Sequence, residues 1–433
     1  MRSILRLVAL SLAFGPFACG VDERSVDTGN VVEPYGGDSP PGGNGMATVP
    51  NAPAPSSPNN ESPSNESPSN AAPNGNNSEA PPVVQLPPAE PPTTPAEPDE
   101  VTNPEGGEMP APPPEEPPVV AGPVVPPSDL PPAGEAGVPE PAGAAANLRV
   151  LDWAGFEAAI SYTFDDSNQS QIDHYAELQA LGVPLTFYLQ TNKQQNMSPI
   201  WMQAVRDGHE LGNHTQSHQS TGANIGADTD TATNFIQSRF GVTVYTMAAP
   251  NGSTAYSPIA QSRFLINRGV NDQRIAPNDN TDPFNLPCFI PPTNASTAMF
   301  NAKVDAIRNT GTWQTVLVHG FPGSNDGAFQ PVDINQFTAG VRYAKGFGDV
   351  WIDTVVSVAA YWRAQKTFTS VTPVTANGAT TWSWRLPDHF PPDQYLRVTV
   401  DGGTLRQGDA SLAWDDHGYY EVSLDRGTLT LSP

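Results

Sequence analysis

The chain has 433 residues, with 49 prolines, 37 glycines and a formal net charge of −25. So acidic a balance argues against a nucleic-acid partner, which requires a basic face. The length allows two or three domains, but Pro and Gly far above average usage indicate that part of the chain does not fold.

Residues 1–19 resemble an export signal. Arg2 and Arg6 precede an apolar run that is too short for an ordinary membrane-spanning helix. The run ends in "GPFACG", where Cys19 resembles the lipidated cysteine of bacterial lipoproteins, although Pro16 stands where that motif usually has Leu. We therefore expect an exported cell-envelope lipoprotein, with the membrane as a partner through Cys19. The alternative is ordinary signal cleavage and a secreted protein.

Residues 20–147 predict a disordered linker. The segment is rich in Pro, Asn, Ser and Glu, contains the near-repeat "NESPSNESPSN", and has few large apolar residues. Such a composition cannot bury enough surface to offset its ordering entropy. The segment holds 19 acidic residues against one Arg, so most of the net charge lies here and the folded remainder is only mildly acidic. Its prolines favour extended polyproline segments, which makes it a semi-rigid spacer.

Residues 148–366 predict an α/β domain, because apolar strand-like runs alternate with helical patterns. About seven such runs indicate a distorted (β/α) barrel, a fold whose chemistry lies at the C-terminal ends of the strands. The expected strands are 158–164, 184–189, 209–213, 242–248, 264–270, 315–318 and 350–352, and the expected helices include 169–181, 199–207, 298–309 and 336–345.

Residues 367–433 predict a small all-β, sandwich-like domain. Segments such as "TWSWRL", "YLRVTV" and "YYEVSL" alternate with turns such as "DGG" and "DRG". Trp382, Trp384 and Trp414 could stack on sugars, but filling a small core is the favoured interpretation. Cys288, the only cysteine besides Cys19, is expected to be a small buried hydrophobe.

Titratable side chains gather at three of the expected strand ends. Asp165 and Asp166 end the first strand, and adjacent carboxylates at a buried position need a positive partner. His214 and His218 are spaced i, i+4, so on a helical turn they would share one face and could hold one metal. His319 follows the apolar run "QTVLV". Each feature alone could be a helix cap or a hydrogen-bonded histidine, but their shared sheet edge favours a divalent metal site.

The words "TFDD", "HTQSH" and "LVH", in this order, resemble the first, second and fifth motifs of the polysaccharide deacetylases (the NodB homology family, family 4 carbohydrate esterases). The resemblance covers the expected barrel only. It implies that Asp166, His214 and His218 are metal ligands. It also implies that Asp165 is the general base and that His319 is the general acid.

The same resemblance implies a cofactor and a substrate class. A ligand set of two His and one Asp suits Zn²⁺, with Co²⁺, Ni²⁺ or Mn²⁺ as alternatives. The implied activity is metal-dependent removal of acetyl groups from an acetylated polysaccharide partner, either an N-acetylglucosamine polymer or an O-acetyl xylan. The alternative is a non-catalytic glycan-binding protein on a decayed deacetylase barrel.

The third motif departs from the family pattern. The segment "AAPNG" has Ala248 where the family has Arg, and Asn251 where the family has an aromatic residue. The backbone N–H of Asn251 is expected to face the oxyanion. The family's Arg contacts the base, and Arg268 is the candidate to replace it, although it could equally be a surface residue. Lys193 and Arg274 are weaker candidates, because they lie in expected loops.

The fourth motif of the family, an Asp-rich segment followed by Trp, is not recognisable. The segment "RGVNDQR" occupies its place. Asp272 in this segment is a candidate for the carboxylate that orients His319, and Asp353 at the end of the last expected strand competes with it.

Overall fold

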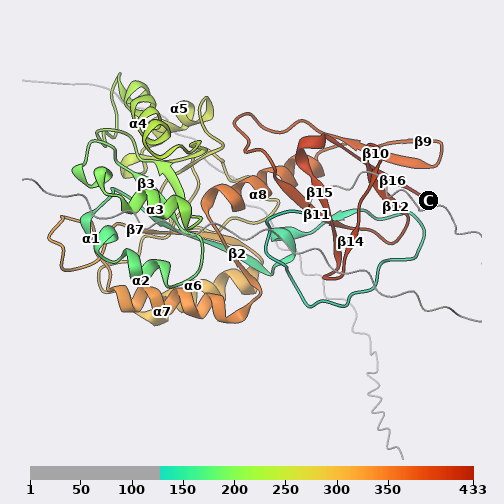
Figure 1. Ribbon diagram of the computed structural model, residues 1–433, viewed down its shortest axis with the longest axis horizontal. Helices are drawn as coiled ribbons and strands as arrows, with labels where there is room; N and C mark the ends of the chain where they lie inside the picture. The colour runs from blue at the N-terminus through green and yellow to red at the C-terminus, as the bar shows by residue number, and fades with distance from the viewer. Residues whose placement is uncertain (1–126) are drawn as a thin grey trace, which may run out of the picture. The chain divides into compact units, whose positions relative to one another are not determined.

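The computed structural model describes residues 127–433 (Figure 1). The expected signal peptide, the expected lipid anchor at Cys19 and the expected linker as far as residue 126 lie outside the described residues. The chain divides into two units, Met1–Gly107 and Glu108–Pro433, and every described residue belongs to the second. None of the described helices is long and apolar enough to cross a membrane.

Seven parallel strands form the α/β domain, which confirms the expected distorted barrel. The sheet order is β6-β5-β4-β3-β2-β7, and β8 pairs with the first half of β2, before β3 begins to pair with its second half. The strands are β2 (Ala158–Phe164), β3 (Thr186–Leu189), β4 (Glu210–Asn213), β5 (Thr246–Ala248), β6 (Ile266–Arg268), β7 (Trp313–Val318) and β8 (Val350–Ile352).

A short loop segment, residues 286–289, bridges the two end strands of this sheet. Leu286 forms an isolated parallel bridge with Arg268 of β6, and Phe289 forms one with Val316 of β7. Cys288 lies in this segment with 1% of its surface exposed, as expected for a small buried hydrophobe. The barrel is therefore completed by four residues of loop, and this accounts for its distortion.

Helices follow most of the strands, and α6 and α7 pack beside each other (Figure 1). The described α-helices are α1 (Gln169–Asp173), α2 (Tyr175–Gln179), α3 (Ile200–Arg206), α4 (Ile225–Phe240), α5 (Ser257–Gln261), α6 (Thr297–Thr310), α7 (Ile334–Phe347) and α8 (Val355–Thr369). The expected helix 169–181 is interrupted at His174, which separates α1 from α2. The sequence interpretation did not name α4, which is rich in Thr, Asp and Asn and therefore carries a weak helical signal.

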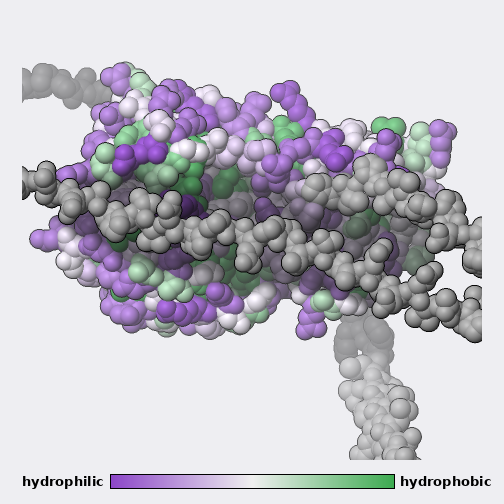
Figure 2. All heavy atoms as spheres, viewed as in Figure 1, coloured by the Kyte–Doolittle hydropathy of each residue, from purple (hydrophilic) through white to green (hydrophobic). Residues whose placement is uncertain are grey.

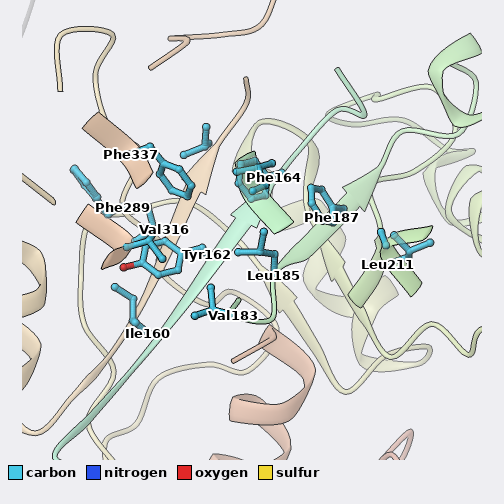
Figure 3. Packing of buried hydrophobic residues seen from close by; sticks show 14 of the residues in the cluster. Ile160, Tyr162, Phe164, Val183, Leu185, Phe187, Leu211, Phe289, Val316 and Phe337 are labelled. Carbon is cyan, nitrogen blue, oxygen red and sulfur yellow. The ribbon is translucent and has the colours of Figure 1, made fainter. Parts of the chain in front are cut away.

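The core lies between the sheet and its helices (Figure 3). Every residue of β2 is buried, as expected for a parallel strand covered on both faces. Phe164 at the end of β2 stacks on Phe187 of β3 with ring centroids 5.1 Å apart, and Phe337 of α7 meets Phe164 edge-on at 5.6 Å. This packing fixes the end of β2, where the two aspartates follow. On the face shown in Figure 2, the described surface is mostly hydrophilic.

Two antiparallel sheets form the C-terminal domain, which confirms the expected all-β architecture. Their orders are β1-β11-β15-β14 and β13-β12-β16-β10-β9. The strands are β1 (Arg149–Val150), β9 (Val374–Ala376), β10 (Ala379–Ser383), β11 (Tyr395–Thr399), β12 (Thr404–Gln407), β13 (Ala410–Ser411), β14 (Trp414–Asp415), β15 (Tyr419–Ser423) and β16 (Thr428–Ser432). Trp382, Trp384 and Trp414 pack against the core of this domain, in line with the favoured core-filling interpretation.

The C-terminal boundary of the expected linker needs correction. Residues 127–147 pack on the β domain: the Arg397 guanidinium donates hydrogen bonds to the carbonyls of Leu130 (3.0 Å) and Pro131 (2.8 Å), and Trp414 Nε1 donates to the carbonyl of Val138 (2.9 Å). Prolines lack an N–H group, but their carbonyls still accept hydrogen bonds, so a Pro-rich segment can dock without a strand of its own. Residues 149–150 also change domain, because β1 pairs with β11.

Candidate active site

The register of the parallel sheet brings the predicted residues to one edge. Phe164 at the end of β2 pairs with Val318 at the end of β7, so Asp165 and His319 both follow the same level of the sheet. On the other side, Leu189 of β3 pairs with Asn213 of β4, which places His214 just beyond. The sequence interpretation that the three strand ends meet is therefore confirmed.

Asp166, His214 and His218 form a cluster that could hold a metal ion. Their candidate ligand atoms all lie within 4.8 Å of one another. His214 Nε2 is 3.3 Å and His218 Nε2 is 3.5 Å from the same Asp166 oxygen, Oδ1. The predicted ligand set therefore converges on one point between a carboxylate and two imidazoles.

The two histidines meet through a turn, and this corrects the expected helical turn. Thr215 and His218 both adopt left-handed backbone angles (φ 62° and 58°). Thr215 holds the turn: its N–H donates to Asn213 Oδ1 at 2.7 Å, and its Oγ1 accepts from the His218 N–H at 3.0 Å. The i, i+4 spacing was the right signal, but the rings are brought together by side-chain hydrogen bonds instead of helix geometry.

A backbone hydrogen bond fixes which nitrogen of His214 faces the cluster. His214 Nδ1 lies 2.8 Å from the carbonyl oxygen of Ala248, so Nδ1 donates a proton to that oxygen and Nε2 faces Asp166. Burial alone would raise the pKa of Asp166, but the hydrogen bond and charge of His214 hold that pKa well below its ordinary value. Burial, followed by the charge of His214, lowers the pKa of His218. The donor set therefore fits a divalent cation.

Asp165 has a different environment, because it is held by Arg268. The Arg268 Nη2 group donates a hydrogen bond to Asp165 Oδ2, and the two side chains are 1% and 2% exposed. Ala248 and Arg268 are register partners on β5 and β6, so the guanidinium comes from the strand next to the position where the family has its Arg. Burial would lower the pKa of Arg268, but the charge of Asp165 raises it above its ordinary value.

The other candidate cations do not contact Asp165. Lys193 donates from Nζ to Asn168 Oδ1 at 2.9 Å, and Arg274 is an exposed residue. Asp165 Oδ1 is buried and has no hydrogen-bond partner among the described residues. One oxygen of Asp165 is thus fixed by Arg268, and the other is free to accept a proton.

His319 lacks the orienting carboxylate that the sequence interpretation proposed. Asp272 is exposed and pairs with Lys303, while Asp353 accepts hydrogen bonds from Trp351 Nε1 (3.0 Å) and the Thr354 N–H (2.7 Å). Both candidates are therefore wrong, because their carboxylates are committed elsewhere. Within residues 127–433, His319 Nδ1 is buried without a hydrogen-bond partner. Burial lowers the pKa of His319, against the raising effect of the two aspartates.

Gln171 and Asn168 support the loop that carries His319. Gln171 Nε2 and Asn168 Nδ2 each donate to the His319 carbonyl at 2.8 Å, and Gln171 Nε2 also donates to the carbonyl of Asp165. One buried amide thus joins the segments that carry the base and the acid. The sequence interpretation missed both residues, although they follow closely on "TFDD", Asn168 just before the expected helix and Gln171 within it.

A cavity of about 360 Å³ contains the whole constellation. It is lined by Asp165, Asp166, His214, His218, Ala249, Asn251, Gly252, Arg268, Val270, Ile290, Leu317, His319 and Phe329. Asn251 has a left-handed backbone (φ 53°), and its side-chain amide donates to Ser220 Oγ at 2.7 Å. Gly252 has a φ of +63°, and a Cβ there would lie 2.2 Å from a Val270 methyl, so only glycine fits. Val270, Ile290 and Phe329 were not among the residues predicted from the sequence.

Comparison with models of protein families gives a match to part of the chain. Residues 156–264 match the family model described as polysaccharide deacetylase. This confirms the predicted resemblance for the segment that carries Asp165, Asp166, His214, His218 and Asn251, while His319 lies beyond it. No curated protein matches the sequence.

Several solved structures are similar to part of the chain. One is the Xyl-CE4 domain of a multidomain xylanase from the hindgut metagenome of Trinervitermes trinervoides, with 22% identity over 46% of this chain and 88% of that one (TM-score 0.33). Another is a putative polysaccharide deacetylase from Mycobacterium smegmatis, with 19% identity over 56% and 99% (TM-score 0.35). A third is the catalytic domain of the peptidoglycan N-acetylglucosamine deacetylase from Eubacterium rectale, with 16% identity over 49% and 93% (TM-score 0.34).

Proposed function

We propose that this protein is a metal-dependent hydrolase that removes acetyl groups from an acetylated polysaccharide. The observation that carries the proposal is the convergence of a His₂Asp cluster, a second buried carboxylate and a histidine in one cavity. These are the groups that hydrolysis of an amide or ester requires: a site for a cation, a base and an acid.

Asp166, His214 and His218 would hold the cation, which we expect to be Zn²⁺, with Co²⁺, Ni²⁺ or Mn²⁺ as alternatives. The orientation of His214, whose Nε2 faces Asp166, and the lowered pKa of Asp166 support this assignment. When bound, a divalent cation would polarise the acetyl carbonyl and increase the acidity of a water molecule.

Asp165 would act as the general base. Its free oxygen, Oδ1, takes a proton from the attacking water, and the water oxygen forms a bond to the acetyl carbonyl carbon. Arg268 donates a hydrogen bond to the other oxygen, so the side chain of the base is held in one orientation. The backbone N–H of Asn251, in the cavity wall, would donate to the oxyanion that develops on the carbonyl oxygen.

His319 would act as the general acid. As the bond between the carbonyl carbon and the sugar nitrogen or oxygen breaks, the imidazolium donates its proton to that leaving atom, and the acetic acid that forms loses the second proton of the water to solvent and is released as acetate. The proton that Asp165 took from water then restores the protonated imidazole. Burial is the largest effect on His319 and lowers its pKa, against the raising effect of the two aspartates, so the protonated imidazole gives up its proton readily.

A non-catalytic glycan-binding protein is the alternative function. The sequence argument for it was the missing Arg at Ala248. Since Arg268 supplies a guanidinium to Asp165 from the neighbouring strand, the substitution at Ala248 is no longer a reason to expect a decayed site.

The test is acetate release from N-acetylglucosamine oligomers, peptidoglycan and acetylated xylan, using protein whose metal content has been measured. We expect release that a chelator abolishes and that added Zn²⁺ or Co²⁺ restores. Asp165→Asn should bind metal and release almost no acetate. Binding of these glycans without acetate release by any metal-loaded form would favour the non-catalytic alternative.

We also propose that the protein is exported and anchored through Cys19, which rests on the sequence alone. Metabolic labelling with a radioactive fatty acid should mark the wild type and leave Cys19→Ala unlabelled. Equal labelling of both, or of neither, would exclude an anchor at this position.

A further inference from the structure

Phe329 is an exposed aromatic residue on the wall of the catalytic cavity. The exposed fraction of Phe329 is 57%. Among the described residues, Phe347 is the other large aromatic with a substantial exposed fraction, 36%. The ring of Phe347 is covered by the Arg308 guanidinium, which lies 3.7 Å from the ring centroid. Val270 also lines the cavity and is 37% exposed. Single exposed apolar side chains are common on protein surfaces, but two of them beside a charged cluster in one cavity indicate a binding surface.

The loop that carries Phe329 is anchored to the start of the barrel. Ser324 Oγ donates to Asp173 Oδ2 at 2.6 Å, and the Ser170 N–H donates to Asp326 Oδ2 at 2.7 Å. Past Phe329, the Val332 N–H closes the loop on the carbonyl of Gly320 at 3.1 Å. The loop is therefore anchored both before and after Phe329 in the chain, so the exposed ring lies on a fixed loop.

The ring of Phe329 stands edge-to-face with His319. The ring centroids are 5.3 Å apart and the planes meet at 84°. In the proposed reaction His319 gives its proton to the sugar nitrogen or oxygen that leaves. The sugar ring bonded to that atom must therefore lie beside His319, which is where Phe329 presents its exposed surface.

We propose that Phe329 forms a sugar subsite, on which the pyranose ring that carries the acetyl group stacks with its apolar C–H face. The proposal rests on the proposed deacetylase function and deepens it, because it assigns the leaving-group side of the cavity to a pyranose. An aromatic face next to polar groups is the combination that suits a sugar, which has both an apolar face and hydroxyl groups. A small acetyl ester with no sugar would not use this surface.

The experiment compares Phe329→Ala, Phe329→Trp and the control Phe347→Ala on metal-loaded protein. The substrates are chitotetraose, acetylated xylotetraose and 4-nitrophenyl acetate. For the oligosaccharide that the wild type deacetylates, kcat/KM of Phe329→Ala should fall by about 10- to 100-fold, the range for losing one aromatic stacking contact. This loss should exceed the loss on 4-nitrophenyl acetate at least tenfold, and Phe329→Trp should recover most of it. Phe347→Ala should match the wild type.

Binding to metal-stripped protein gives a readout without turnover. Titration calorimetry with the same oligosaccharide should show a Kd weakened about tenfold or more in Phe329→Ala and preserved in Phe329→Trp. Equal losses on all three substrates would show that Phe329 only packs against His319, and would overturn the proposal. An unchanged Kd and kcat/KM would overturn it as well. A wild type that releases no acetate from either oligosaccharide or from peptidoglycan would instead refute the proposed function, and the subsite with it.

Discussion

Replacing Arg268 by Ala should cripple turnover and leave the metal cluster intact. Arg268 contacts Asp165, which is not one of the three clustered ligands, so metal content should stay at the wild-type level. The substitution removes a charge-assisted hydrogen bond between two side chains that are 1% and 2% exposed. Such a bond contributes about 1.5–3 kcal/mol, which corresponds to a loss in kcat of about 10- to 150-fold.

Stability gives the second readout of Arg268→Ala. In metal-free protein the change leaves the buried carboxylate of Asp165 without its guanidinium partner. A buried charge that loses its partner should cost roughly 3–5 kcal/mol of stability, measured by denaturant unfolding.

The assay is steady-state acetate release across pH, with elemental analysis of each variant. Arg263→Ala is the matched control, because Arg263 forms an ion pair with Asp230 at the surface, where both side chains are partly exposed. That pair should contribute at most about 1 kcal/mol to stability and nothing to kcat. An Arg268→Ala variant with normal kcat and unchanged stability would refute the assignment of Arg268 to the base.

Elemental analysis should show that metal and activity are lost together in each of three variants, Asp166→Ala, His214→Ala and His218→Ala, whereas Asp165→Asn should keep its metal. Equal metal loss in all four variants would remove the distinction between the two aspartates. A protein that starts at residue 147 should have a Tm roughly 5–15 °C below that of a protein that starts at residue 127, because buried Arg397 loses two carbonyl partners. An unchanged Tm in calorimetry would show that residues 127–146 belong to the linker. Gly252→Ala should reduce both kcat and Tm, because the new methyl group clashes with Val270. Gly346→Ala in α7 should keep kcat and raise stability by about 0.5–1 kcal/mol, because a Cβ there has no neighbour within 4 Å. Similar behaviour of the two variants would contradict the steric argument.

The barrel and its chemistry could be predicted because strong local signals agreed with one another. The run that ends at Phe164 is mostly apolar and has an uninterrupted strand pattern, and the observed β2 has the expected bounds, Ala158–Phe164. The position of Arg268 could also be inferred, because parallel neighbours end at one level of the sheet and β6 follows β5 in the chain. These inferences needed only the order of the strands and the shared direction of their ends.

The errors arose where long-range contacts override composition. Residues 127–147 have a composition typical of disorder, and donors far along the chain, such as Arg397 and Trp414, hold their carbonyls. The sequence position of Asp272 predicted that it orients His319, but its carboxylate forms an ion pair with Lys303 of α6. Phe329 gave no periodic signal, because it lies in a loop whose shape depends on hydrogen bonds to α1 and the residues beside it. None of these partners lies in the same local segment as the residue that it positions.

The four-residue bridge at 286–289 has a consequence for solubility. The strands β6 and β7 end the sheet, and an uncovered end strand offers unpaired N–H and C=O groups to another chain. Here Leu286 exchanges hydrogen bonds with residues 267 and 269, and Phe289 with residues 315 and 317, so the same short segment covers both edges. A substitution that detaches this segment would expose the unpaired N–H and C=O groups of both end strands at once. Its first effect would be aggregation between molecules, even with every group of the catalytic cavity still present in the chain.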